Sequence, residues 1–318
     1  MISFYKYNSG YDVRETFIYS QHLKYGFFEL QYEYLYNIVF KVMVNDLDYE
    51  ISVFSRYLDL LHVERSKPSY DYLAALVKAH LTRVPFENIS KLYYRKKSNL
   101  RSLPDLDKYL DGIEKYNFGG TCYSNNYYLY LLLRHLGFDI KLCGADMSNP
   151  DVHLVSIVSL ADREYVIDVG YAAPFIMPMP RDLRTDYEIV LGNDRYVLRP
   201  QDSRGRSEVE LYRDGHYKHG YIIKPNARAI GEFADVIARS YSHEATFMNA
   251  LLLVRFYHHR SVVIHNLTLI KSEGAIQERF PLPDRETLTQ KIEEYFEIPR
   301  DIAREAIADL GELQNAWN

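Results

Sequence analysis

The segment Gly119–Asp139 reads GGTCYSNNYYLYLLLRHLGFD and contains the change of pattern that decides the fold. Two glycines precede a strongly apolar run with helical spacing, and Gly137 is the predicted C-terminal stop of that helix. Beyond Gly137 apolar residues alternate with polar ones, which is the period of strands. Cys122 therefore falls in the first turn of the predicted helix, directly after the glycine pair.

The patterns on either side of this segment predict an α+β fold in three parts. Helical spacing begins at about residue 51, and Ser69 is a predicted N-cap of a helix that ends before Pro85. Strands are predicted at 140–145, 153–158, 165–169, 187–190, 196–198, 209–212, 217–223, 251–257 and 261–270, and late helices at 285–296 and 300–310. Many short strands joined by turns indicate a central β-barrel or a strongly curved sheet.

The composition excludes several classes of protein. The 318 residues are 47% apolar and 25% charged, which is not the composition of a disordered or low-complexity chain. The net charge of −5 predicts no basic surface for nucleic acid. No apolar run approaches the roughly 18 residues of a membrane span, and no secretory signal pattern is present. With two cysteines the chain has no disulfide framework, so we expect a cytoplasmic protein with reduced thiols.

Cys122 is the first candidate catalytic residue because of its position at the start of a helix. Unpaired N–H groups and the helix dipole favour an anion there, so they stabilise a thiolate. A buried structural cysteine behind a glycine-rich turn is the alternative interpretation of the same residues. Cys143 lies in a predicted strand without such a context, and we expect it to be inert core.

His153 and Asp168 lie on two consecutive predicted strands and complete a candidate Cys-His-Asp triad. A four-residue loop at 159–162 would place them directly opposite each other, with Cβ atoms roughly 5 Å apart. A two-residue loop would make them diagonal neighbours on the same face. In either register the carboxylate can orient the imidazole, which in turn activates a nearby cysteine. Taken alone, His153 is explained as a core histidine and Asp168 as a turn-capping aspartate. The prediction of a triad therefore depends on Cys122, His153 and Asp168 together.

With Pro85-Phe86-Glu87-Asn88, these residues resemble the arylamine N-acetyltransferase family. That family has a PFEN motif, a Gly-Gly-x-Cys motif with asparagine four residues after the cysteine, a strand histidine and an Asp-x-Gly-aromatic motif. The matching residues here are Gly119-Gly120-Thr121-Cys122 with Asn126, then His153, then Asp168-Val169-Gly170-Tyr171. The resemblance covers about residues 51–310 and includes Ser242–Phe247 and VVIHNLTLIKSEG at 262–274.

The resemblance implies three domains on a cysteine-proteinase-like core. A helical bundle at residues 51–137 would carry the nucleophile, and an antiparallel β-barrel at 138–230 would carry the histidine and the aspartate. An α/β lid would occupy residues 231–318. Residues 1–50 have no counterpart in the family and are an N-terminal extension of unknown role.

The resemblance also implies a ping-pong acetyl transfer in xenobiotic metabolism. Cys122 would take the acetyl group of acetyl-CoA as a thioester and pass it to an arylamine, arylhydrazine or N-hydroxyarylamine. His153 would be the general base, Asp168 would orient it, and Phe86 and Tyr171 would line the acceptor pocket. We expect no metal, nucleic acid or membrane partner. The CoA-binding residues and the oligomeric state are left open.

The sequence departs from the family pattern at several positions. Phe118 replaces the arginine that pairs with the PFEN glutamate in the family, so Glu87 either has another partner, for which Arg83 is the candidate, or lies in water. Ser124 replaces a usual Glu or Gln, and Ala172 replaces the glycine after the Asp-x-Gly-aromatic motif.

Three alternatives to arylamine acetylation are consistent with these residues. The segment between Cys122 and His153 is trimmed at Ser148–Asp151, which leaves room for an amide synthase or other acyl transfer on the same triad. A cysteine hydrolase or transglutaminase-type enzyme would use a similar triad. Phe118 and Ser124 motivate a non-catalytic homologue that binds aromatic ligands.

Overall fold

A computed structural model describes residues 48–257 and 260–313. Most of the predicted N-terminal extension, residues 1–47, lies outside the described residues. The chain divides into two units after Ser52, and the second unit, which begins at Val53, contains both sheets and the candidate site. In that unit residues 53–61 are helical. The further helices are α2 (Tyr70–Arg83), α3 (Ile89–Ser98), α4 (Leu106–Tyr116), α5 (Cys122–His135), α6 (Ala234–Arg239), α7 (Thr246–Asn249), α8 (Arg285–Phe296) and α9 (Arg300–Ile307), with a short 3-10 helix at Ile230–Phe233.

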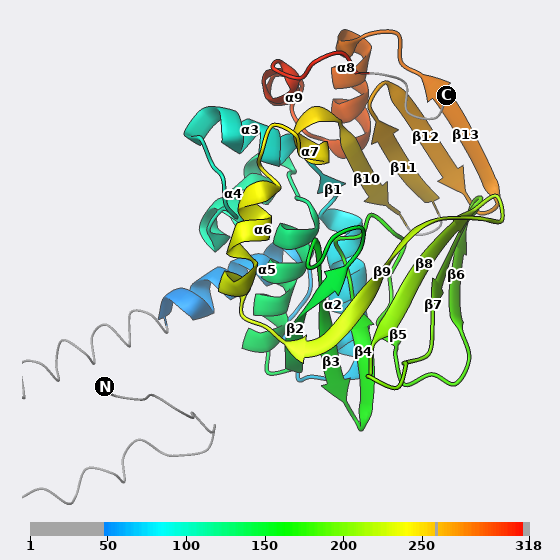
Figure 1. Cartoon of the computed structure of the whole chain (residues 1–318). Helices are drawn as coiled ribbons and strands as arrows, with labels where there is room; N and C mark the ends of the chain where they lie inside the picture. The colour runs from blue at the N-terminus through cyan, green and yellow to red at the C-terminus, as the bar shows by residue number, and fades with distance from the viewer. Residues whose placement is uncertain (1–47, 258–259, 314–318) are drawn as a thin grey trace, which may run out of the picture. The chain divides into compact units, whose positions relative to one another are not determined.

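The strands form two antiparallel sheets. The larger sheet has the order β5-β4-β3-β2-β9-β8-β7-β6 and curves into a nearly closed barrel (Figure 1). Its strands are β2 (Asp139–Asp146), β3 (His153–Leu160), β4 (Arg163–Ile167), β5 (Met179–Pro180), β6 (Tyr187–Leu191), β7 (Asp194–Leu198), β8 (Ser207–Arg213) and β9 (His216–Ala227). The second sheet, in the order β1-β10-β11-β12-β13, consists of β1 (Phe86–Glu87), β10 (Leu252–Phe256), β11 (Arg260–His265), β12 (Thr268–Glu273) and β13 (Ile276–Pro281). Together with the helices, these sheets confirm the predicted α+β class.

Local sequence signals explain the helices that carry the site. Ser69 caps α2 as predicted, since its hydroxyl accepts a hydrogen bond from the Tyr72 N–H at 3.1 Å. Gly137 has a φ of 89° directly after α5, which confirms it as the helix stop. Helix α5 packs against β2 and β3, so the helix that begins at Cys122 lies beside the strand that carries His153 (Figure 1). No helix within the described ranges is long and apolar enough to cross a lipid bilayer.

The hairpin between β3 and β4 sets the register of the predicted catalytic strands. Leu160 pairs with Arg163, so the loop has two residues, and the four-residue loop was the wrong prediction. Ala161 and Asp162 adopt φ of 49° and 63°, the left-handed conformation of a tight hairpin turn whose twist matches that of the strands. In this register Asp168 follows the end of β4 and is a diagonal neighbour of His153, as the two-residue alternative predicted.

The predicted single strand at 261–270 was wrong, because the chain turns back at Asn266. That residue has a φ of 49°, and asparagine tolerates the left-handed conformation better than most residues. The result is a hairpin in which His265 pairs with Thr268. Helix α8 covers the resulting sheet through a shared apolar core that includes Leu288 and Ile292 (Figure 1).

Candidate active site

The PFEN segment holds the glycine loop that precedes Cys122. The Glu87 N–H donates to the Gly120 carbonyl at 3.0 Å, and the Gly120 N–H donates to the Pro85 carbonyl at 3.4 Å. Gly119 lies so close to this segment that a Cβ there would be 1.9 Å from the Pro85 carbonyl oxygen. The close approach excludes any side chain at Gly119 and fixes where α5 begins, with Cys122 as its first residue.

Glu87 is completely buried, and backbone amides rather than Arg83 satisfy its carboxylate. Its two oxygens accept hydrogen bonds from the Gly119 N–H at 3.0 Å and from the Ser90 N–H at 2.8 Å. Burial raises the pKa of Glu87, and hydrogen bonds with Ser90 and Gly119 oppose that shift. The predicted partner Arg83 is exposed and instead donates to the Leu60 carbonyl at 2.7 Å, so that prediction was wrong.

Phe118 occupies the position of the family's arginine and serves as a packing residue. Its ring is 1% exposed and lies in an aromatic cluster with Tyr93, Tyr94 and Tyr116, at centroid distances of 5.7, 5.8 and 5.1 Å. Such edge-to-face and tilted arrangements are favourable between aromatic rings. Because the Glu87 carboxylate already has backbone donors, the loss of a guanidinium at residue 118 leaves no charge unsatisfied.

His153 and Asp168 form a buried hydrogen-bonded pair. His153 Nε2 lies 2.8 Å from Asp168 Oδ2, and the two residues are 2% and 1% exposed. The Tyr221 hydroxyl donates to the same Asp168 oxygen at 2.6 Å, while the Asn126 amide and the Gly170 N–H donate to the other at 2.9 Å each. Burial alone would raise the pKa of Asp168, but the charge of His153 and these hydrogen bonds lower it.

Asn126 connects helix α5 to the strands that carry His153 and Asp168. Its Nδ2 donates to the Leu154 carbonyl at 2.6 Å as well as to Asp168, and its Oδ1 accepts from the Val169 N–H at 2.8 Å. The loop after Asp168 also touches α5 directly, since a Cβ on Gly170 would lie 2.6 Å from the Cys122 Cα. Four residues after the nucleophile, one side chain thus fixes the orientation of the aspartate.

The structure brings all three predicted catalytic residues together. Cys122 is 9% exposed, and its sulfur lies 3.8 Å from the Val152 carbonyl, next to His153 in the chain. Burial would lower the pKa of His153, but the Asp168 carboxylate and hydrogen bonding with Asp168 and Cys122 raise it to about 10. His153 therefore carries its proton next to the Cys122 sulfur, where it can exchange that proton with a reacting group.

A cleft of about 820 Å³ opens beside the sulfur of Cys122. Phe247 lines it, and Phe86 packs edge-to-face on Phe247 with ring centroids 5.6 Å apart. The segment that contains Phe247 is tied to the PFEN motif, since the Asn88 amide donates to the Phe247 carbonyl at 2.8 Å. The predicted acceptor residue Phe86 is therefore one layer behind a cleft-lining aromatic ring that sequence reasoning did not single out.

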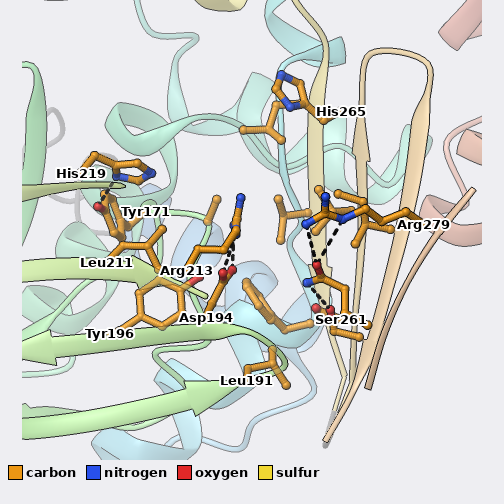
Figure 2. Close-up of a pocket in the computed structure, with 18 residues that line it drawn as sticks. Tyr171, Leu191, Asp194, Tyr196, Leu211, Arg213, His219, Ser261, His265 and Arg279 are labelled. Atoms are coloured by element: carbon orange, nitrogen blue, oxygen red, sulfur yellow. Dashed lines mark hydrogen bonds and ion pairs between the residues drawn. The ribbon is translucent and has the colours of Figure 1, made fainter. Parts of the chain in front are cut away.

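Tyr171 lies between His153 and a second cavity, of about 250 Å³, that separates the two sheets. Its ring contacts that of His153 at 5.6 Å, and its hydroxyl hydrogen-bonds His219 Nδ1 at 2.6 Å. Figure 2 shows the pair of Tyr171 and His219 on one side of this cavity and His265 on the other. The triad does not line this cavity, so the cleft beside Cys122 is the candidate site of acyl transfer.

Tyr221 and Phe247 are the site residues that sequence reasoning missed. Tyr221 lies in β9, 53 positions from the Asp168 carboxylate that it contacts, and it resembles any other tyrosine of an alternating strand. Within the described residues no group of three His, Cys, Asp or Glu side chains has a geometry that could hold a metal ion.

Comparison with known proteins gives one consistent result. A family model described as N-acetyltransferase matches residues 69–304. The pineal gland arylamine N-acetyltransferase isozyme NAT-3 of Gallus gallus is 30% identical over 125 residues, which are 37% of this chain and 41% of that protein. Arylamine N-acetyltransferase 1 of Oryctolagus cuniculus is 29% identical over 156 residues, 46% of this chain and 50% of that protein. The matches to these curated relatives thus span about half of their length or less.

The similarity in structure covers more of the chain than the similarity in sequence does. The structure of the arylamine N-acetyltransferase from Salmonella typhimurium superposes with a TM-score of 0.67 at 18% sequence identity. The superposition covers 81% of this chain and 98% of that one.

Proposed function

This chain belongs to the arylamine N-acetyltransferase family, and from that premise we propose that it moves an acetyl group from acetyl-CoA to an aromatic nitrogen through a Cys122 thioester. The acceptors are an arylamine, an arylhydrazine or an N-hydroxyarylamine. The observation that carries the proposal is the Cys122–His153–Asp168 arrangement, with its 2.8 Å bond between imidazole and carboxylate, beside a substrate-sized cleft.

In the first half-reaction the Cys122 thiolate attacks the thioester carbonyl of acetyl-CoA. The carbonyl oxygen becomes an oxyanion, for which the Cys122 N–H at the start of α5 is the candidate donor. When the tetrahedral intermediate collapses, the carbon–sulfur bond to CoA breaks and the CoA thiolate takes a proton from the His153 imidazolium. Acetyl-Cys122 and neutral His153 remain.

In the second half-reaction the amine nitrogen attacks the acetyl-Cys122 carbonyl. His153 accepts the proton that the nitrogen loses, the carbon–nitrogen bond forms, and the Cys122 thiolate leaves. Asp168 stabilises the imidazolium formed in this step and holds the tautomer of the ring, as in other catalytic triads. Both half-reactions together therefore return the enzyme to the thiolate–imidazolium state.

The aromatic residues near the cleft suit a flat acceptor. Phe247 lines the cleft with Phe86 behind it, and Tyr171 lies against the His153 ring. An aromatic amine could stack on such rings while its nitrogen approaches the acyl carbon. We propose Phe86 and Tyr171 as residues of the acceptor pocket and add Phe247, whose ring faces the cleft while Phe86 supports it from behind.

The assignment of parts to domains is consistent with the same reaction. The helical part, residues 51–137, supplies the nucleophile, and the barrel, residues 138–230, supplies the histidine and the aspartate. Residues 231–318 form the lid. We place the enzyme in the cytoplasm, where thiols stay reduced and acetyl-CoA is available.

Intact-mass spectrometry after incubation with acetyl-CoA tests the proposal. We expect one added acetyl group that maps to Cys122, and release of free CoA thiol when phenylhydrazine or aniline is also present. Cys122→Ala should abolish both signals, whereas the matched variant Cys143→Ala should retain them. An unmodified wild-type protein would refute the proposal. A thioester that turns over in water without an acceptor would favour a hydrolase instead.

A further inference from the structure

Lys91 is a buried lysine next to the nucleophile, and the acetyl transfer proposed above does not use it. It lies in the first turn of α3 and is 6% exposed. Its Nζ donates to the Ser240 hydroxyl at 2.8 Å and lies over the Tyr241 ring, 4.1 Å from the centroid. Both partners are uncharged, so neither compensates a buried positive charge.

Among the described residues, no ion pair joins Lys91 to an acidic side chain. Three acids line the same cleft: Asp151 pairs with Lys224 at 2.6 Å, Glu232 pairs with Arg228 at 2.6 Å, and Asp235 is exposed to solvent. A buried ammonium without a counter-ion is unfavourable. Accordingly burial lowers the pKa of Lys91 to about 8, while the nearby Cys122 opposes that shift. An anion bound beside Lys91 would remove this penalty.

The position of Lys91 limits which part of a substrate it can meet. Lys91 lines the cleft beside Cys122 and also a small internal cavity of about 20 Å³ on its other side. Thr121 and Tyr123, the chain neighbours of Cys122, line both cavities as well. A group at Lys91 is therefore close to the acylated sulfur. The phosphates of CoA are separated from that sulfur by the whole pantetheine arm, so they cannot be this group.

We propose that Lys91 binds the free carboxylate of a dicarboxylic acyl group, such as malonyl or succinyl, while that group is carried on Cys122. The inference rests on the proposed acyl transfer and names the class of donor for the same site. Of the proposed acceptor residues, Phe247 lines the same cleft as Lys91 and Tyr171 lies against His153; Lys91 is the buried cation of that cleft.

The chemistry with such a donor is balanced in the same way as with acetyl-CoA. The Cys122 thiolate attacks the thioester carbonyl of malonyl-CoA, the bond from that carbon to the CoA sulfur breaks, and CoA leaves with the proton of the His153 imidazolium. The amine then attacks malonyl-Cys122, its proton goes to His153, and the product is an N-malonyl amide. The distal carboxylate takes no part in bond making; it pairs with Lys91.

A pair of donors of similar shape isolates this contact. We would measure single-turnover acylation of Cys122 by mass spectrometry with malonyl-CoA and with isovaleryl-CoA, in which an isopropyl group replaces the carboxylate. A general effect of Lys91 on the nucleophile changes both rates alike, so the ratio of the two reports the carboxylate contact. The variants are Lys91→Met, which keeps most of the stem, Lys91→Arg, which keeps the charge, and Lys96→Met, an exposed control on the same helix.

We expect wild-type protein to favour malonyl-CoA and Lys91→Met to lower the malonyl-to-isovaleryl ratio by about tenfold or more, the usual effect of losing a charge-assisted hydrogen bond. Lys91→Arg should keep part of the preference and Lys96→Met all of it. A wild-type protein without the preference, or an unchanged ratio in Lys91→Met, overturns the inference. If Lys91→Met does not fold, the wild-type ratio and Lys91→Arg decide.

Two further arms separate this inference from its alternatives. With acetyl-CoA as donor, acetylation of 4-aminobenzoate is compared with that of 4-isopropylaniline. A change in that ratio in Lys91→Met, without a change in the donor ratio, would assign the carboxylate to the acceptor and overturn the inference. If acetyl-CoA acylates Cys122 and malonyl-CoA does not, the inference alone fails. If no donor acylates Cys122, the proposed function fails and the inference fails with it.

Discussion

Glu87→Gln is the substitution that most directly tests how the nucleophile is positioned. The buried carboxylate accepts hydrogen bonds from the Gly119 N–H at 3.0 Å on one oxygen and from the Ser90 N–H at 2.8 Å on the other, and the Ser90 side chain and the Ile89 backbone also bond to it. A glutamine side chain has one oxygen and one NH2 group, so it turns a donor toward either the Gly119 N–H or the Ser90 N–H, which bond to different oxygens of the carboxylate. A buried N–H left without an acceptor costs about 1–3 kcal/mol. We therefore expect Glu87→Gln to lower the free energy of unfolding by about 2 kcal/mol.

The effect on the site depends on which amide loses its partner. If the Gly119 N–H is the one left unpaired, the glycine loop is no longer fixed against the PFEN segment, and Cys122 shifts relative to His153. Urea unfolding followed by circular dichroism gives the stability, and the rate of iodoacetamide alkylation of Cys122 under native conditions reports its alignment. We expect alkylation to be slower in Glu87→Gln than in the wild type.

Arg83→Met is the matched control for this prediction. Arg83 is exposed and contacts the Leu60 carbonyl rather than Glu87, so its loss should change stability by no more than about 0.5 kcal/mol. If Arg83→Met destabilises the protein as much as Glu87→Gln, and the double variant is no worse than either single variant, Arg83 and Glu87 act as one pair. That result would refute the backbone-amide explanation.

Four other measurements test separate parts of the structure. Ala172 adopts a φ of 60°, a conformation that costs a non-glycine residue about 1–2 kcal/mol. Part of that gain is lost in Ala172→Gly because glycine is more flexible in the unfolded chain, so urea unfolding should show a net stabilisation of roughly 0.5–1 kcal/mol. A loss of stability would contradict this. Tyr221→Phe removes a buried 2.6 Å hydrogen bond to the Asp168 carboxylate and should destabilise by about 2 kcal/mol. Because that bond lowers the pKa of Asp168, the acid limb of the pH–activity profile should also move to higher pH, a shift that a merely structural role would not produce. The pKa of His153 is raised to about 10, so the protonated ring contributes fully to the free energy of unfolding below pH 6.5, its ordinary pKa, and that contribution is lost as the pH rises through 10. Unfolding measured from pH 6 to 10.5 should show this loss of stability in the wild type and not in His153→Gln. Burial raises the pKa of the Cys143 thiol to about 12, so peptide mapping after brief iodoacetamide treatment at pH 7.5 should find Cys143 unmodified. Alkylation of Cys143 as fast as that of Cys122 would count against its assignment as inert core.

The candidate triad could be predicted from the sequence because each member carries a local signal. Glycines before a helix, a histidine in an apolar strand and an aspartate at a strand end can each be recognised within a few residues of chain. The hairpin between β3 and β4 shows where local reasoning reaches its limit. Loops of two and four residues both put His153 and Asp168 on one face, and only the left-handed turn at Ala161 and Asp162 decides between them.

The supporting contacts could not be predicted, because they join segments that are distant in the sequence. Tyr221 contacts a carboxylate 53 residues away, and Lys91 contacts a hydroxyl 149 residues away. Such pairs depend on how β9 and α6 pack against the rest of the protein, which no periodicity encodes. Arg83 was the wrong partner for Glu87 for a related reason. A search for an opposite charge overlooks backbone amides, which every residue except proline supplies.

The PFEN motif therefore acts in this protein as a structural connector between three segments. Glu87 holds the glycine loop before the nucleophile, and Asn88 holds the 247–252 segment through hydrogen bonds to Phe247 and Ala250 and from the Leu252 N–H. One side chain thus fixes the position of Cys122, and the next fixes the aromatic wall of the cleft. Because both side chains bond to backbone atoms, the residues they position can vary in identity while the geometry is kept. This explains how Phe118 can replace an arginine without disturbing the site.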